Sequence, residues 1–392
     1  MVMTAKLTRG FLLRAGKAGG TGRAGRSGSG PGRPSRPDRS TLQSRLADIF
    51  TGMKNCKVLR GCLAVALLAG WPGLSSAQTF ESIGVRAQGM SAFVAVADDA
   101  TASWWNPAGL ATGQYLSNVT ERGRMTEPSN PTTDAPAVRT ASSTFAIAFP
   151  ALGLSYYRLR ISATTPLAST GTDGPTRQDQ RIAGTSLHSV AITQFGATIG
   201  QSIGDHLVIG STLKLLRAGA VSGESTDASP LDAADELKVP RHTRADLDVG
   251  AMATAGHVRL GLTVKNLTEP TFDTGGSDRA TLSRQVRAGI AILTVRNGVR
   301  KGLIVAADAD VTTMSTADGD VKHVAAGFER WMAGGRFGFR AGVSANMVGE
   351  RRPAGSAGLS VALTRALSVN ASRTVGRDES VTGWSAGVNV AY

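Results

Sequence analysis

The amino-acid sequence predicts an all-β protein, a transmembrane antiparallel β-barrel of about 14 strands with an N-terminal plug segment. Three observations support this fold class. A segment built like an export signal precedes the body of the chain, apolar and polar residues alternate along almost every run after residue 112, and long polar loops alternate with tight turns.

The chain starts with a leader in two parts. Residues 1–52 are rich in Gly, Arg, Ser and Pro, so they are either a disordered basic extension or a mis-assigned translation start. From residue 53 onward, basic residues precede the apolar run Cys62–Ala69, and small residues at Ser75–Ala77 offer a cleavage site. We therefore expect a signal peptide at residues 53–77.

The basic charge of the sequence is concentrated in this leader. The formal net charge is +14, and residues 1–77 hold 13 of the 43 Lys and Arg residues but only 2 of the 29 Asp and Glu residues. The remainder is nearly neutral and lacks a basic surface with interleaved aromatics, which excludes nucleic acid as a partner. Both cysteines, Cys56 and Cys62, fall in the leader, so the rest of the chain has no thiol for a disulfide, a zinc site or a nucleophile.

The stretch that follows the leader is the most distinctive in the sequence. Residues Gly84–Ala111 read GVRAQGMSAFVAVADDATASWWNPAGLA. Asn106 and Pro107 predict a turn, because proline cannot continue a strand and asparagine readily bonds the local backbone. The acidic pair Asp98 and Asp99 is either a solvated turn or a partner for arginines inside the barrel.

This stretch resembles the N-terminal signature of the FadL-type long-chain fatty-acid transporters and their PorV-like relatives. The resemblance implies that residues 78–113 form a plug inside or across the barrel and that the Asn-Pro-Ala element takes part in gating. It therefore makes four residues the plug and gating candidates: Asp98, Asp99, Asn106 and Pro107. The segment Leu260–Phe272 also resembles a strand and turn of this family.

Residues 114–392 show the period of two that is typical of strands, and we expect them to form the barrel. One example is the run at 258–264, in which Val258, Leu260, Leu262 and Val264 alternate with more polar residues. The predicted strands are 114–125, 141–150, 152–162, 186–199, 206–221, 243–255, 257–267, 283–293, 301–313, 321–333, 336–346, 355–364, 366–374 and 381–392.

The connections favour a membrane barrel over a soluble β-sandwich, which would also alternate polar and apolar residues. Long polar loops are expected at 126–140, 163–185, 222–242 and 268–282. Tight turns are expected near Pro150, Gly204, Gly256, Gly334-Gly335 and Arg365. Long loops on one side and short turns on the periplasmic side are typical of outer-membrane barrels. The even number of strands supports the same choice.

Aromatic residues at strand ends offer membrane anchors. The terminal strand ends on Tyr392, which resembles the C-terminal aromatic signal that outer-membrane assembly machinery reads. Four other aromatics are expected at the membrane interfaces: Tyr156, Tyr157, Trp331 and Trp384. The expected partners are thus outer-membrane lipid, the assembly machinery and a hydrophobic ligand.

Seven charged residues occupy the polar faces of their strands and are the candidates for the interior of the barrel: Asp246, Asp248, Arg259, Arg287, Asp308, Asp310 and Arg340. They are interpreted either as a ladder of paired charges that stiffens the interior or as a selective surface that also holds the plug.

The sequence offers no catalytic constellation. The five histidines are scattered without the spacing of metal ligands, and Ser211 and Lys214 match a Ser-x-x-Lys motif on an expected strand, where their side chains point to opposite faces. We expect no enzymatic activity, no cofactor and no metal.

Two functions remain open. The first is an outer-membrane barrel of a Gram-negative-type bacterium that passes a hydrophobic small molecule through a plugged pore. The second is a non-transporting barrel that acts as an anchor or partner in a secretion or conjugation assembly. The ligand and the oligomeric state are not fixed by the sequence.

Overall fold

A computed structural model describes residue 81 and residues 83–128, 136–166, 184–273, 279–294, 302–316, 319–377 and 380–392. The expectations for residues 1–52 and 53–77 lie outside this range.

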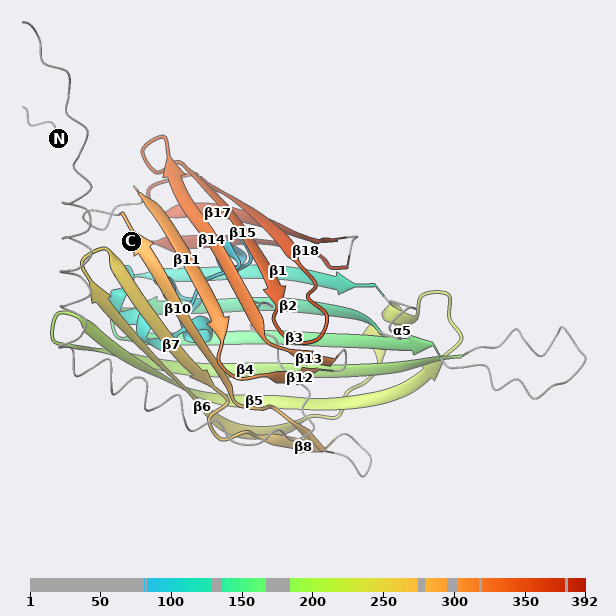
Figure 1. Cartoon of the computed structure of the whole chain (residues 1–392). Coiled ribbons are helices and arrows are strands. Elements are labelled where there is room, and N and C mark those ends of the chain that lie inside the picture. Colours follow the sequence, from blue (N-terminus) through green and yellow to red (C-terminus); the bar gives the residue numbers. More distant parts are fainter. Residues whose placement is uncertain are drawn as a thin grey trace, which may run out of the picture. The chain divides into compact units, whose positions relative to one another are not determined.

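Fourteen antiparallel strands close into a barrel (Figure 1). Each strand pairs with its neighbours along the chain, and β1 closes the barrel by pairing with β18. The strands are β1 (Ser117–Glu127), β2 (Ala137–Phe149), β3 (Leu152–Pro166), β4 (Thr185–Ile203), β5 (Leu207–Ser225), β6 (His242–Ala255), β7 (Val258–Lys265), β10 (Gln285–Leu293), β11 (Leu303–Asp310), β14 (His323–Met332), β15 (Phe337–Asn346), β16 (Ala354–Ala362), β17 (Leu367–Gly376) and β18 (Thr382–Ala391). All fourteen predicted strands are confirmed, with boundaries that differ by a few residues.

The alternation in the sequence separates the two faces of the wall. Large apolar side chains such as Leu154, Phe195 and Leu213 are exposed on the outside, whereas charged residues such as Lys214 and Asp308 are buried inside. A soluble sandwich would bury its apolar face, so this inverted arrangement excludes it and is typical of a barrel that faces lipid. Among the described residues, no helix has the length and hydropathy needed to cross a membrane.

The two ends of the barrel differ in their connections. Turns such as those at Gly204, Gly256 and 333–336 are short and lie at the same end as Tyr392. The opposite end carries helix α5 (Pro230–Glu236) and two small hairpins, β8 (Thr271–Asp273) with β9 (Arg279–Thr281) and β12 (Met314–Thr316) with β13 (Gly319–Val321).

Two of the loop predictions are wrong in part. Residues 222–242 contain the end of β5 and helix α5, and residues 268–282 contain the β8–β9 hairpin. Strands β4 and β5 are 19 residues long, so they extend beyond the predicted ranges. The added residues of β5 (222–225) lie at the end that carries helix α5, whereas those of β4 (200–203) lie at the short-turn end. Arg139 and Ser162, which point outward from β2 and β3, bind Asp235 of α5.

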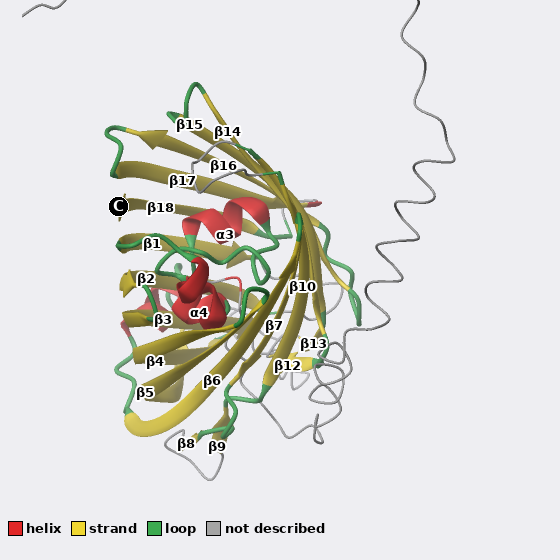
Figure 2. Ribbon diagram, turned by 90° about the vertical axis from the view of Figure 1, so that its left-hand side faces the viewer, coloured by secondary structure: helices red, strands yellow, loops and turns green. Residues whose placement is uncertain are grey.

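Residues 83–113, which precede β1, lie inside the barrel. They contain α3 (Val85–Met90), α4 (Ala102–Trp105) and the 3-10 helix η3 (Pro107–Thr112). Figure 2 shows α3 and α4 enclosed by the strands. We call residues 83–113 the inner segment. Almost all of its residues are buried.

Candidate functional site

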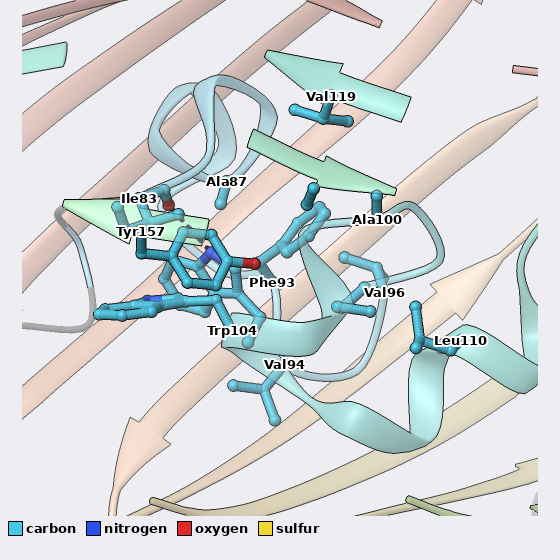
Figure 3. Close-up of a cluster of buried hydrophobic side chains, with 14 of the residues drawn as sticks. Ile83, Ala87, Phe93, Val94, Val96, Ala100, Trp104, Leu110, Val119 and Tyr157 are labelled. Carbon is cyan, nitrogen blue, oxygen red and sulfur yellow. Dashed lines mark hydrogen bonds between the residues drawn. The ribbon is translucent and has the colours of Figure 1, made fainter. Parts of the chain in front are cut away.

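The inner segment has an apolar side that forms the main core of the molecule. Phe93, Trp104 and Trp105 are buried and cluster with inward-facing side chains of the wall (Figure 3). The rings of Phe93 and Trp105 lie edge to face at 5.8 Å, and those of Trp104 and Tyr157 at 5.1 Å. Such ring pairs add to the stabilisation from buried area. The barrel interior is therefore filled at this level by the segment's own aromatic residues.

Two of the expected interface aromatics belong to this interior. Tyr157 is fully buried, and its hydroxyl lies 2.5 Å from the Ser103 hydroxyl of α4. Trp331 points inward, and its indole N–H donates to Glu329 over 3.2 Å. Their expected location at the membrane surface is wrong, because both occupy the inward register of their strands.

A charge cluster anchors the polar side of the segment. Arg86 binds Asp98 and Asp99 of the same segment and donates to Glu329 of β14 at 2.8 and 2.9 Å. Glu329 also accepts a hydrogen bond of 2.5 Å from Arg340 of β15. Asp98 and Asp99 thus pair with an arginine inside the barrel, Arg86, which lies on the inner segment itself, and the link to the wall runs through Glu329.

Arg86 is held in its charged form. Burial alone would lower the pKa of its guanidinium, but Asp98, Glu329 and Asp99 surround it and raise the pKa well above the usual value. Arg86 therefore keeps the positive charge that this contact requires at any physiological pH.

Carboxylates of the wall also bind the backbone of the inner segment. Asp308 of β11 accepts hydrogen bonds from the N–H groups of Phe93 (2.5 Å) and Val94 (2.8 Å). Glu121 of β1 accepts one from Val85 over 3.0 Å. The segment has no regular partner strand here, so these carboxylates satisfy donors that would otherwise be buried without a partner.

Arg287 of β10 joins the start of the described chain to the wall. It pairs with Asp310 of β11 at 2.6 Å and with Glu81 at 2.7 Å. Burial would raise the pKa of the Glu81 carboxyl, but the neighbouring Arg287 outweighs it and holds this pKa at about 2. Because the pKa is depressed, the tether is fully present above the ordinary value near 4.5 and is lost only as the pH falls toward 2.

A second buried cluster lies on β5 and β6. The ammonium of Lys214 contacts Asp246 at 3.0 Å, Asp248 at 2.6 Å and the side-chain oxygen of Asn266 at 2.7 Å. Asp248 in turn accepts from the Asn266 N–H, and Asp246 accepts from the Thr268 N–H. This cluster therefore fixes the connection that leaves β7, and it belongs to the ladder of paired charges that the sequence suggested.

Glycines of the wall make room for the inner segment. A Cβ atom at Gly250 of β6 would overlap the side-chain oxygen of Asn106 and lie 2.9 Å from the Pro107 ring. The same close approach of segment backbone occurs at Gly210, Gly261, Gly327 and Gly342. Asn106 donates to the carbonyls of Val94 (3.0 Å) and Ala251 (3.2 Å), and its oxygen accepts from Ala108 to start η3. The Asn-Pro turn is thus bonded to the wall through its side-chain amide.

Gly250→Val should displace this turn, because the new side chain fills the space of Asn106. We expect a loss of stability of about 1–3 kcal/mol from overpacking and faster proteolysis within the inner segment. Limited proteolysis and thermal unfolding in detergent would measure both. Gly355→Val is the matched control, since a Cβ atom there meets only a carbonyl oxygen at 4.0 Å. Equal behaviour of the two variants would contradict the close fit.

A cavity of about 1180 Å³ lies between the polar side of the inner segment and the short-turn end of the barrel. Arg86, Asp98, Asp99 and Glu329 line one end of it, and turn residues near Gly256, Gly334 and Arg365 line the other. The inner segment therefore forms the floor of a vestibule.

The predicted site residues form several separate groups in the structure. The wall residues Asp246, Asp248, Arg287, Asp308, Asp310 and Arg340 are buried and inward, and the half-buried Arg259 lines the vestibule. Sequence reasoning did not select Arg86, Glu121, Lys214 and Glu329 as charges of the interior, although all four are buried or half-buried there. Within the described ranges, no three His, Cys, Asp or Glu side chains converge as a metal site.

Comparison by sequence gives one partial match. A model of a family described as "F plasmid transfer operon, TraF, protein" matches residues 129–310, which is less than half of the chain. No curated protein matches the sequence.

Comparison by structure defines the class of fold. The chain is similar to the toluene transporter TbuX of Ralstonia pickettii (TM-score 0.52, 14% identity, 80% of this chain and 98% of that chain). It is also similar to the CymD monoaromatic hydrocarbon channel (0.50, 14%, 81% and 99%) and to a deletion mutant of the TodX monoaromatic hydrocarbon channel (0.52, 9%, 79% and 99%). The chain therefore has a FadL-type barrel fold, as the sequence resemblance predicted. At these identities the likeness shows the fold alone.

Proposed function

We propose that this protein is an outer-membrane barrel that passes a hydrophobic small molecule passively, with the inner segment as its movable plug. The observation that supports this most is the seating of that segment. It fills the interior with apolar side chains on one side and is held by Arg86, Asp308 and Asn106 on the other. The segment consists of short helices and contributes no strand to the closed sheet. It can therefore move without breaking the hydrogen bonds between the strands of the barrel.

The chemistry of the interior favours an apolar cargo over a polar one. Displacement of Phe93 and Trp104 would uncover apolar wall residues such as Leu159, Ile192 and Leu216. Ligand sites lined by aromatic and aliphatic side chains bind apolar molecules, with a few polar groups to orient them. The hydrocarbon cargo of the similar structures is consistent with this class.

Uptake of labelled toluene by cells that lack the gene tests the proposal. Restoring the gene should raise the uptake rate several-fold, whereas uptake of a polar solute of similar size should not change, because the plug keeps water-filled passage closed. An equal rise for both solutes would indicate an open pore and would contradict a selective path. No rise for toluene or for a labelled long-chain fatty acid would remove the transport proposal.

A second function rests on the partial match to the plasmid-transfer family model. In that case the barrel is an anchor or partner in a conjugation or secretion assembly, as PorV-like relatives suggest. Loss of plasmid transfer on deletion of the gene, with hydrocarbon uptake unchanged, would favour this alternative.

A further inference from the structure

Four arginines stand on the lipid-facing surface at the seam where the barrel closes. The outward positions of most strands are apolar, but those of β1 include Arg122 and Arg124, both exposed. Arg158 of β3 and Arg373 of β17 are also exposed and outward. We call Arg122, Arg124, Arg158 and Arg373 the arginine belt.

The strand register arranges the belt as two pairs. Arg122 lies opposite Ser143 of β2, which lies opposite Arg158. On the other side of β1, Arg124 lies opposite Trp384 of β18, which lies opposite Arg373. Neighbouring strands are about 4.8 Å apart, so the backbones of each pair are separated by about 10 Å. Two arginine side chains can meet on one anion across that distance.

The position of Arg124 and Arg373 along the wall places this pair near the outer boundary of the membrane. Trp384 precedes the C-terminal Tyr392 by eight residues. A strand that rises about 3.3 Å per residue with a tilt of about 40° covers about 20 Å in eight residues, and the apolar band of such barrels is about 25 Å tall. Flexible arginine side chains can extend the remaining distance to the headgroups.

Outside the belt, Arg217 of β5 and Arg330 of β14 are also exposed at outward positions, but other strands carry no such charge. The outward positions of β7, β10, β11 and β15 hold only uncharged residues, as in Leu260, Ile290, Val305 and Phe339. In the described part of the chain, the ion pairs involve other arginines, and none joins a belt arginine to a carboxylate. Charged side chains on a lipid-facing wall are costly, so an anion that binds and neutralises them would be favoured there.

We propose that the arginine belt binds the phosphate groups of a phosphorylated glycolipid of the outer leaflet, of the lipid A class. The inference rests on the proposed outer-membrane location. Arginine suits this ligand, because its planar fork donates two parallel hydrogen bonds to a phosphate. Trp384, which stands between Arg124 and Arg373, supplies an interfacial ring at the level of the headgroups. The two pairs, which meet at β1, match a lipid that carries two phosphates.

Native mass spectrometry of the full barrel in detergent tests the site. The probes are bis-phosphorylated lipid A, the same lipid without phosphates, and inorganic phosphate. The belt variant changes all four arginines to Gln, and the control variant carries Arg330→Gln and Arg336→Gln, which remove exposed arginines at the short-turn end. The parent and the control should retain lipid A, and the belt variant should bind it about tenfold more weakly.

Three outcomes would overturn the proposal. They are equal retention by the belt variant, equal retention of the lipid without phosphates, and displacement of lipid A by equimolar inorganic phosphate. A photo-crosslinker at Thr120, an exposed outward position of β1, should capture lipid in intact cells. Capture of a polypeptide there would assign the surface to a protein partner.

The variants also separate this inference from the proposed function. If the belt variant does not fold, two double variants replace it. R122Q/R158Q and R124Q/R373Q each remove one arginine pair, and each should weaken lipid A binding several-fold. The belt variant should still take up toluene, because it leaves the interior unchanged. If the belt variant loses lipid binding but keeps normal toluene uptake, the lipid site is supported. If the parent protein binds lipid A but takes up no toluene, the lipid site stands and the proposed transport function fails.

Discussion

Deletion of residues 84–111 should convert the barrel into a water-filled channel. The deleted stretch supplies the aromatic core, Arg86 and the Asn-Pro turn, and these are the groups that fill the interior above the vestibule. The closing strand pairs do not include it, so the barrel should still migrate faster on gels when unheated. Planar-bilayer conductance should rise well above that of the intact protein.

The double change Asn106→Ala with Pro107→Ala should give a smaller and fluctuating rise in conductance. It removes the bonds from the Asn106 amide to Val94 and Ala251 but leaves the segment attached through Arg86 and Asp308. Equal conductance for the intact protein, the deletion and the double variant would mean that the segment does not block the pore.

Lys214→Met should be the most destabilising single substitution in the wall. The ammonium is fully buried and contacts both Asp246 and Asp248, so its removal leaves two uncompensated buried carboxylates. Breaking a buried ion pair from one side costs about 3–5 kcal/mol. The temperature at which the folded gel band disappears should fall markedly.

Two companion variants test the cause of that loss. Adding Asp246→Asn and Asp248→Asn to Lys214→Met should recover part of the stability, because the uncompensated charge is gone. Lys238→Met removes an exposed lysine and should leave the transition unchanged. If the triple variant is no more stable than Lys214→Met, packing rather than charge explains the loss.

The strands could be predicted from the sequence because lipid on one side and a polar interior on the other impose a strict period of two. The placement of α5 could not, since it depends on contacts with strands distant in the sequence, such as that of Asp235 with Ser162 of β3. Nothing in the local pattern of residues 230–236 indicates which strand the helix will contact.

The candidate site was predictable in outline only. Wall charges such as Arg287 and Asp310 stand out because polar and apolar residues alternate around them. Lys214 does not stand out, because Leu213, Leu215 and Leu216 surround it. Its role depends on the register that places it opposite Asp246. The contacts between the wall and the inner segment could not be predicted for the same reason. The need for a glycine at position 250 is evident only once Asn106 is known to lie against it.

A disulfide between the inner segment and the wall tests the central claim most directly. The hydroxyls of Ser91 and Ser356 lie 2.7 Å apart, so cysteines at these positions can join the segment to β16. The natural cysteines, Cys56 and Cys62, precede the expected cleavage site and would be changed to Ser. Ser91→Cys alone is the control.

If the segment is seated as described and must move for passage, the double variant should form an intramolecular disulfide. Toluene uptake should then stop under oxidising conditions and return after reduction, while the control is insensitive to both. Failure to form the disulfide in a folded barrel would contradict the seating of the segment. Undiminished uptake with the disulfide fully formed would contradict the claim that the segment is the movable plug.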